Sequence, residues 1–176
     1  VEQVERLDRL VDSILESVRV VPDRPAELAS IDLNEFVEAL LEDVAPLLHR
    51  HNPGIARSRH LHVLADPARL RQVLEHLLEN AVKYAPPDTR VEVEWTLVEG
   101  VVRIAVSDEG PGIPPEWRER IFEPYSRRET LTARGSGIGL YAARRLAESM
   151  RGRLWCEPGP TGGARFVLAL PAAVAA

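Results

Sequence analysis

Two apolar segments near the middle of the chain, residues 91–97 and 101–106, are separated by Val98 and the dipeptide Glu99-Gly100. In the first segment apolar and polar side chains alternate, which is typical of a strand with one buried face. A glycine between two such segments is typical of the tight turn of a hairpin. The sequence therefore predicts an antiparallel strand pair at this place in the chain.

Cap residues and prolines mark the helices on either side of this pair. Asp32 and Glu35 resemble a capping box, and Asp66 followed by Pro67 opens a second helix. We expect helices at 32–48, 67–84, 116–122 and 137–150, and further strands at 59–65, 153–157 and 164–170. Helices combined with a largely antiparallel sheet predict an α+β two-layer sandwich.

Composition and charge disfavour several classes of protein. The 176 residues are 45% hydrophobic and 28% charged, as in an ordinary globular domain, and the formal net charge of -5 disfavours a broad basic face for nucleic acid. Lys83, the only lysine, follows Val82 and not a glycine, so the chain has no P-loop. No apolar run reaches the roughly 18 residues of a membrane span, and the single cysteine, Cys156, cannot form an internal disulfide.

The helix expected at 67–84 carries polar side chains on one face. Its apolar residues form a stripe, while Gln72, His76, Asn80 and Lys83 fall on another face at spacings of three and four. An asparagine inside a helix lowers the helix propensity, but its amide oxygen can bind Mg²⁺ without adding charge. A lysine one turn later can reach a phosphate. The alternative is a polar face that only meets solvent.

The segment from Ser107 to Pro114 directly follows the second strand of the pair. It places the carboxylate of Asp108 at the strand end, and Gly110 and Gly112 where a backbone can approach a flat ligand. An ionised carboxylate only accepts hydrogen bonds, which suits the exocyclic amine of adenine and opposes the carbonyl of guanine. The alternative is an Asp-Gly turn with a local cap.

A second glycine-rich segment, Gly135 to Leu140, opens the helix expected at 137–150. Successive glycines allow backbone N–H groups to converge on an anion at a helix N-terminus. The spacing differs from the dinucleotide-binding fingerprint, because the third glycine comes one residue early and no strand precedes it. The loop before it, with Arg127, Arg128 and Arg134, is expected to cover a bound ligand. A flexible linker is the alternative.

Together and in this order, the motifs resemble those of the ATP-binding catalytic domain of sensor histidine kinases, within the superfamily that also contains gyrase, a heat-shock chaperone and mismatch-repair ATPases. Residues 69–84 are similar to the family's N-box, 108–113 to its first glycine box, 121–125 to its F-box, 135–140 to its second glycine box and 161–166 to its last one. The resemblance covers residues 32–171, and five boxes in register speak against chance agreement.

The resemblance implies a mixed, largely antiparallel sheet backing three helices, with an ATP lid between the F-box and the second glycine box. By this resemblance Asn80 would bind Mg²⁺ and act in catalysis, Asp108 would bind the adenine amine, and Arg127 would belong to the lid. The residues implied to bind ATP are Asn80, Lys83, Tyr84, Asp108, Gly110, Gly112, Ile113, Tyr125, Arg127, Gly135, Ser136, Gly137, Ile138, Gly139, Leu140 and Thr161.

His76 is the second candidate catalytic residue and departs from the family pattern. The resemblance implies asparagine at this position in the sensor kinase branch and a water-activating glutamate in the gyrase-like relatives. His76 is therefore expected either to act as a base, to sit beside the metal, or to pack next to the site. These alternatives stay open from the sequence.

The resemblance also implies a reaction and partners. The domain would transfer the γ-phosphoryl group of Mg-ATP to an acceptor histidine, for relay to the receiver domain of a response regulator. The family's His-Glu-x-x-Thr-Pro segment does not occur in the chain, so the acceptor is expected on an upstream dimerisation domain. The alternatives are an ATPase or serine kinase of the same superfamily, or a regulatory module that only binds nucleotide.

The first 21 residues look like the end of that upstream domain. Apolar residues from Val4 to Val21 recur at spacings of three and four, as in a bundle helix, although a core helix of the same domain is the alternative. We expect residues 1–21 as the end of the second bundle helix, 22–31 as a linker and 32–176 as the ATP-binding domain. The whole protein is expected to be a homodimer whose catalytic part is cytoplasmic and which does not bind nucleic acid. Whether another part of it is a membrane anchor stays open from the sequence.

Overall fold

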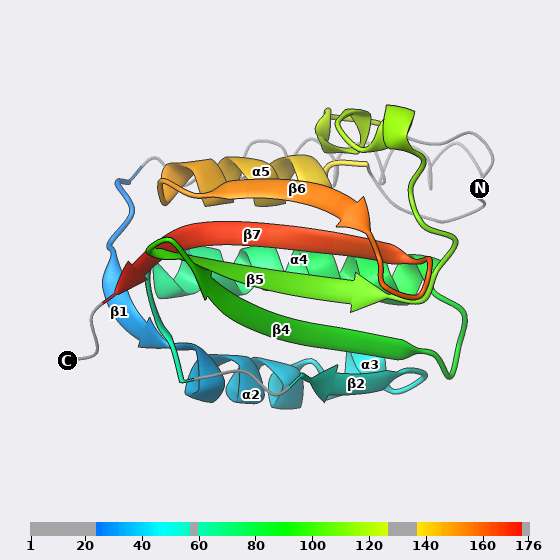
Figure 1. The fold of residues 1–176 in the computed structure, drawn as a ribbon, viewed down its shortest axis with the longest axis horizontal. Helices are drawn as coiled ribbons and strands as arrows, with labels where there is room; N and C mark the ends of the chain where they lie inside the picture. The colour runs from blue at the N-terminus through cyan, green and yellow to red at the C-terminus, as the bar shows by residue number, and fades with distance from the viewer. Residues whose placement is uncertain (1–23, 57–59, 127–136, 174–176) are drawn as a thin grey trace, which may run out of the picture.

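The computed structural model describes residues 24–56, 60–126 and 137–173. Helices cover one face of a seven-stranded sheet, and α4 lies behind its central strands (Figure 1). The helices are α2 (Leu33–Asp43), α3 (Ala45–Leu48), α4 (Pro67–Tyr84) and α5 (Gly139–Ser149). The strands are β1 (Ala29–Asp32), β2 (Asn52–Ile55), β3 (His62–Ala65), β4 (Arg90–Val98), β5 (Val101–Asp108), β6 (Arg153–Pro158) and β7 (Ala164–Ala173). This two-layer α+β arrangement confirms the predicted fold class.

The sheet is mixed and largely antiparallel, as expected. Its strand order is β1-β3-β7-β5-β4-β2, with β6 also paired to β7. Of the strand pairs in the described part of the chain, only β2 and β4 run parallel. The predicted hairpin is β4 and β5, whose turn residues Glu99 and Gly100 have φ of 51° and 79°. Positive φ at both positions is the geometry that two-residue hairpin turns favour.

The core lies between α4 and the sheet. The apolar stripe of α4 is buried and consists of Leu70, Val73, Leu74, Leu77, Leu78 and Ala81. It packs in one cluster with sheet residues that include Trp95, Ile104 and Phe166. Burying each large apolar side chain contributes about 1.5–3 kcal/mol, so this face is strongly held. The polar face of α4 is thereby set in a defined direction, away from the sheet.

Both predicted N-caps are present. The Asp32 carboxylate accepts hydrogen bonds from the N–H groups of Asn34 and Glu35 at the start of α2. The Asp66 carboxylate accepts from the N–H groups of Ala68 and Arg69 at the start of α4. The helix of the N-box therefore begins and ends at the residues that its caps and prolines predicted.

Prolines change two of the expected helices. The helix expected at 32–48 is divided into α2, which ends at Asp43, and the short helix α3, because Pro46 cannot donate the hydrogen bond that would continue α2. The helix expected at 116–122 is wrong. Two 3₁₀ turns, Pro115–Trp117 and Arg120–Phe122, stand there. The segment is short and lies between prolines, so only i to i+3 hydrogen bonds form.

Two edge strands were not expected. Residues Ala29 to Ile31 fall within the expected linker but form most of β1, which pairs with β3. Strand β2 contains Pro53 and Gly54 and pairs with β4 only along one side. Proline and glycine disfavour strands, but an edge position needs only half of the ladder hydrogen bonds.

The remaining boundaries shift by a few residues or fall outside the described ranges. The strand expected at 59–65 is β3, beginning at His62, and the helix expected at 137–150 is α5, beginning at Gly139. The helix expected from Val4 to Val21 lies outside the described residues. None of the helices in the described ranges is both long and apolar enough to cross a bilayer.

Candidate nucleotide-binding site

The start of α5 lies against the polar face of α4. A Cβ atom added to Gly139, the first residue of α5, would lie 3.4 Å from the Nδ1 atom of His76. The His76 ring also approaches Glu79, with 3.8 Å between Nδ1 and Oε2. The nearby His76 ring lowers the pKa of Glu79, although burial opposes that shift. Tertiary packing thus brings the second glycine box and the N-box together.

Asn80 and Lys83 lie on the same face of α4, one and two turns after His76. Asn80 is half-buried, and within the described residues its carboxamide has no hydrogen-bond partner. Lys83 is exposed, and its Nζ atom lies 4.9 Å from the centre of the Tyr84 ring. The carboxamide and the ammonium group are therefore both available to a ligand.

The carboxamide oxygen of Asn80 fits as a single protein ligand of Mg²⁺ held together with a nucleotide. No three His, Cys, Asp or Glu side chains gather as a metal site in the part of the chain that the structure describes. Mg²⁺ at phosphate sites commonly has only one or two protein oxygens and completes its coordination with phosphate oxygens and water. An unpartnered carboxamide oxygen on α4 matches that need.

Asp108 ends β5 and is 97% buried, with only 3% of its surface exposed. Its Oδ1 atom accepts hydrogen bonds from the N–H groups of Gly110 at 2.8 Å and Ala164 at 3.2 Å. Burial raises the pKa of Asp108, and these two hydrogen bonds offset only part of the rise. Its Oδ2 atom has no hydrogen bond with any described residue, so one oxygen remains to accept from a ligand.

Backbone packs on backbone around Asp108. A Cβ atom on Gly110 would lie 2.8 Å from Asp108 Oδ1 and 3.2 Å from the main-chain oxygen of Tyr84. Gly112 has φ of +70°, and a Cβ atom there would lie 2.6 Å from the main-chain oxygen of Gly162. A Cβ atom on Gly163 would overlap the main-chain oxygen of Asp108. The glycines thus allow three loops to meet around one carboxylate.

The structure brings together some of the other expected residues. The N–H of Tyr125 donates to the main-chain oxygen of Gly137 at 3.1 Å, which joins the F-box to the second glycine box. Ile138 is buried, Leu140 and Ile113 are half-buried, and Tyr125 is exposed. Thr161 is exposed in the turn before β7. Arg127, Gly135 and Ser136 lie outside the described residues.

Three residues of the site had no role assigned from the sequence, although two of them lie in the segment similar to the last glycine box. Gly163 and Ala164 close the main-chain packing around Asp108, and Glu79 pairs with His76. The adjacent pair Gly162-Gly163 just before a strand was a signal for close backbone approach. The spacing of three between His76 and Glu79 was a signal for a side-chain pair on one helix face.

A sequence profile of the family described as "Histidine kinase-, DNA gyrase B-, and HSP90-like ATPase" matches residues 65–174. The chain belongs to this ATPase family. The match begins at the last residue of β3 and ends one residue after β7, so it includes the polar face of α4, Asp108 and α5.

Three relatives resemble the chain in sequence or structure. Adaptive-response sensory kinase SasA of Trichormus variabilis is 42% identical over 111 residues, 62% of this chain and 28% of SasA. Sensor protein RstB of Escherichia coli is 33% identical over 175 residues, 96% of this chain and 40% of RstB. Full-length ShkA, solved in complex with AMPPNP, has a TM-score of 0.81 at 31% identity, covering 99% of this chain and 38% of ShkA.

These likenesses confirm the resemblance to the ATP-binding catalytic domain of sensor histidine kinases. The chain spans less than half the length of each of the three relatives.

Replacing Gly163 with alanine is expected to lower the free energy of unfolding by about 3 kcal/mol, because the new Cβ atom would overlap the backbone of Asp108. Chemical denaturation followed by circular dichroism measures this. Gly54→Ala is the matched control, since its Cβ atom would meet only Arg90 side-chain atoms at 3.8 Å and 3.9 Å. Equal effects at the two positions would contradict the close packing around Asp108.

Proposed function

We propose that this domain binds Mg-ATP and transfers its γ-phosphoryl group to a histidine on another segment of the full protein. The observation that carries this proposal is the presence, in one fold, of two polar groups that still have an oxygen free to meet a ligand. They are the buried Asp108 carboxylate at the end of β5 and the Asn80 carboxamide on α4. The presence of AMPPNP in ShkA, which is 31% identical to this chain, supports the nucleotide.

Asp108 would select adenine. Its ionised Oδ2 atom can accept a hydrogen bond from the exocyclic amine of adenine, whereas guanine would present a carbonyl oxygen to it. The hydrogen bonds from Gly110 and Ala164 hold the carboxylate in one orientation. A guanine would leave a buried carboxylate unpaired against an oxygen, which is strongly unfavourable.

The start of α5 would bind the phosphates. Asp side chains cap α2 and α4, but the N-cap of α5, Ile138, makes no side-chain cap hydrogen bond. The first N–H groups of α5 therefore have no side-chain partner on the cap residue, and an anion is favoured there. Lys83 adds a positive charge on the neighbouring helix. Bound Mg²⁺ would neutralise phosphate charge beside the Asn80 oxygen.

Phosphoryl transfer places few chemical demands on the domain itself. The acceptor imidazole nitrogen would form a bond to the γ-phosphorus while the bond to the bridging oxygen breaks and ADP leaves. Catalysis of this step consists mainly of positioning and charge stabilisation. Asn80, Lys83 and the start of α5 are the groups of this chain that would supply both. We also propose that His76, whose ring approaches Glu79, lies beside the same phosphates.

The proposal extends to the partners of the full protein. The acceptor histidine would lie on an upstream dimerisation domain, with residues 1–21 as the C-terminal part of its second helix. A response regulator receiver domain would take the phosphoryl group next. We place this catalytic domain in the cytoplasm as part of a homodimer.

ATP hydrolysis is a second candidate function, favoured by the pair of His76 and Glu79. A histidine whose ring approaches a carboxylate is a suitable base for activating water. Hydrolysis and transfer differ in what attacks the γ-phosphorus, and the groups that would hold ATP are the same in both.

Incubation with γ-labelled ATP and Mg²⁺ distinguishes the two reactions. The chain is mixed with a dimerisation domain that carries an acceptor histidine, taken from the same full-length protein. An acid-labile, base-stable label on that domain is expected. Steady phosphate release without label would instead establish hydrolysis, and an acid-stable label would indicate serine transfer. Nucleotide binding without either reaction would indicate a regulatory module that only binds nucleotide.

A further inference from the structure

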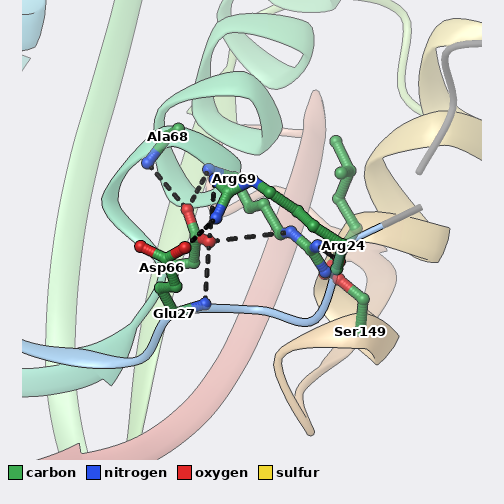
Figure 2. Close-up of polar contacts among 7 residues, drawn as sticks. Arg24, Glu27, Asp66, Ala68, Arg69 and Ser149 are labelled. Carbon is green, nitrogen blue, oxygen red and sulfur yellow. Dashed lines mark hydrogen bonds and ion pairs between the residues drawn. The ribbon is translucent and has the colours of Figure 1, made fainter. Parts of the chain in front are cut away.

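The buried carboxylate of Asp66, at the start of α4, contacts residues 24–28, the entering segment that leads into β1. Asp66 is 1% exposed and Arg69 is 2% exposed. Figure 2 shows the Asp66 carboxylate between the first turn of α4 and the segment with Arg24 and Glu27. Its Oδ1 atom accepts from Ala68 and Arg69, and its Oδ2 atom accepts from the N–H of Glu27 at 3.0 Å.

Two arginines complete this cluster. Arg24 Nη2 lies 3.4 Å from Asp66 Oδ2, and Arg69 Nη2 donates to the main-chain oxygen of Arg24 at 2.5 Å. Arg69 Nε is 3.8 Å from Asp66 Oδ2 and is buried without a hydrogen bond in the described structure. The entering segment thus supplies a main-chain N–H and the Arg24 guanidinium to Asp66, and a main-chain oxygen to Arg69.

The entering segment is also packed by apolar contacts. Ala26 and Leu28 pack against the hydrophobic core, and β1 follows directly, paired with β3. Burial raises the pKa of Asp66, but the hydrogen bond from Glu27, the one from Arg69 and the nearby arginines outweigh it and lower the pKa overall. The carboxylate is therefore stabilised in its charged form by the very segment that it holds.

We infer that residues 24–28 belong to the rigid catalytic domain, and that Asp66 couples this segment to α4 by serving both as its anchor and as the N-cap of the helix. Residues 24–28 then move together with α4 and are not themselves a pivot. Since α4 also carries His76, Asn80 and Lys83, the position of the segment affects the nucleotide site. This second consequence rests on the proposed function, whereas the anchor itself does not.

Amide hydrogen exchange of the whole chain, read by NMR, tests the anchor. Arg24→Ala is expected to speed exchange at the amides of Glu27, Ala68 and Arg69 together, by about five- to tenfold, because all three amides share the Asp66 carboxylate. Glu27→Ala is the matched control. It removes the exposed partner of Arg24 but keeps the main-chain N–H, and should change exchange by less than about twofold. Faster exchange at Glu27 alone, or no change at any of the three, would overturn the anchor.

The coupling to the nucleotide site is tested with AMPPNP and Mg²⁺. Coupling between two sites is reciprocal, so saturating AMPPNP should slow exchange at the Glu27 amide by about threefold or more. Calorimetry on the same sample reports binding separately. Heat of binding with unchanged exchange at Glu27 would overturn the coupling, whereas no heat would overturn the proposed function and leave the anchor standing on the Arg24→Ala result.

Asp66→Asn separates the charge from the cap. Asparagine is also a good N-cap, so the hydrogen bonds to the first turn of α4 can persist while the charge opposite Arg24 and Arg69 is lost. The melting temperature is expected to fall by about 5–10 °C because Arg69 is left buried without its counter-ion. An unchanged melting temperature would contradict the role of the charge.

Discussion

Replacing Asn80 with alanine is expected to lower the rate of phosphoryl transfer by about 10³-fold without unfolding the domain. The side chain lies on the polar face of α4, and within the described residues it makes no hydrogen bond, so the fold does not depend on it. Its loss would remove the proposed protein oxygen for Mg²⁺. Transfer of label from γ-labelled ATP, with circular dichroism as a folding check, measures the effect.

One control and two further test variants on the same helix accompany Asn80→Ala. Gln72→Ala, two turns earlier on an exposed part of α4, should leave transfer within about twofold of the original rate. Asn80→Asp keeps an oxygen ligand and should retain more activity than alanine. His76→Asn should change the pH dependence of the rate if the ring acts as a base, and only KM if it positions the phosphates. A transfer rate of Asn80→Ala equal to that of the original protein would contradict the assignment of Asn80 to Mg²⁺.

Replacing Asp108 with asparagine is expected to weaken ATP binding by about 10³-fold. The amide can present N–H groups where the carboxylate presents only acceptors, and the N–H groups of Gly110 and Ala164 already need an acceptor. The remaining amide group would then face the adenine amine donor to donor. Calorimetric titration with ATP and Mg²⁺ measures the affinity. Glu109→Gln, at the exposed neighbouring position, should bind within about threefold of the original.

The same carboxylate gives the affinity a pH dependence with a defined sign. The pKa of Asp108 is raised by burial, so protonation of this group begins at a higher pH than for an ordinary aspartate. The protonated acid cannot accept from the adenine amine through the same oxygen, and ATP affinity should fall as the pH is lowered through this raised pKa. Asp108→Asn should lose that acid limb. An unchanged acid limb in the variant would assign the titration to another group.

Local patterns predicted most of the elements that carry the site. Alternating side chains predicted β4 and β5, and the caps and prolines of α4 predicted its ends at Pro67 and Tyr84. The apolar stripe of α4 predicted which face would be buried, and so which face would present His76 and Asn80. These features depend on residues within one or two turns, whose spacing can be read directly along the chain.

Local patterns failed where a distant partner decides the conformation. Strand β2 contains Pro53 and Gly54 and extends only because β4 pairs with one of its edges. Residues Ala29 to Ile31 read as part of a linker, yet β3 holds them in the sheet. The segment between Pro115 and Pro124 read as a helix, but forms two 3₁₀ turns that place Phe122 in the core.

The order and spacing of the motifs thus predicted the family and the residue types of the site. Each motif is a short segment, and its own residues determine its chemistry. The contacts between motifs were not predicted. Gly139 beside His76, Gly163 against Asp108, and Asp66 holding Glu27 each join residues far apart in the chain. These residues meet because β5 pairs with β7, because α5 packs on α4, and because the entering segment runs past the start of α4. No local pattern specifies which distant surfaces will meet.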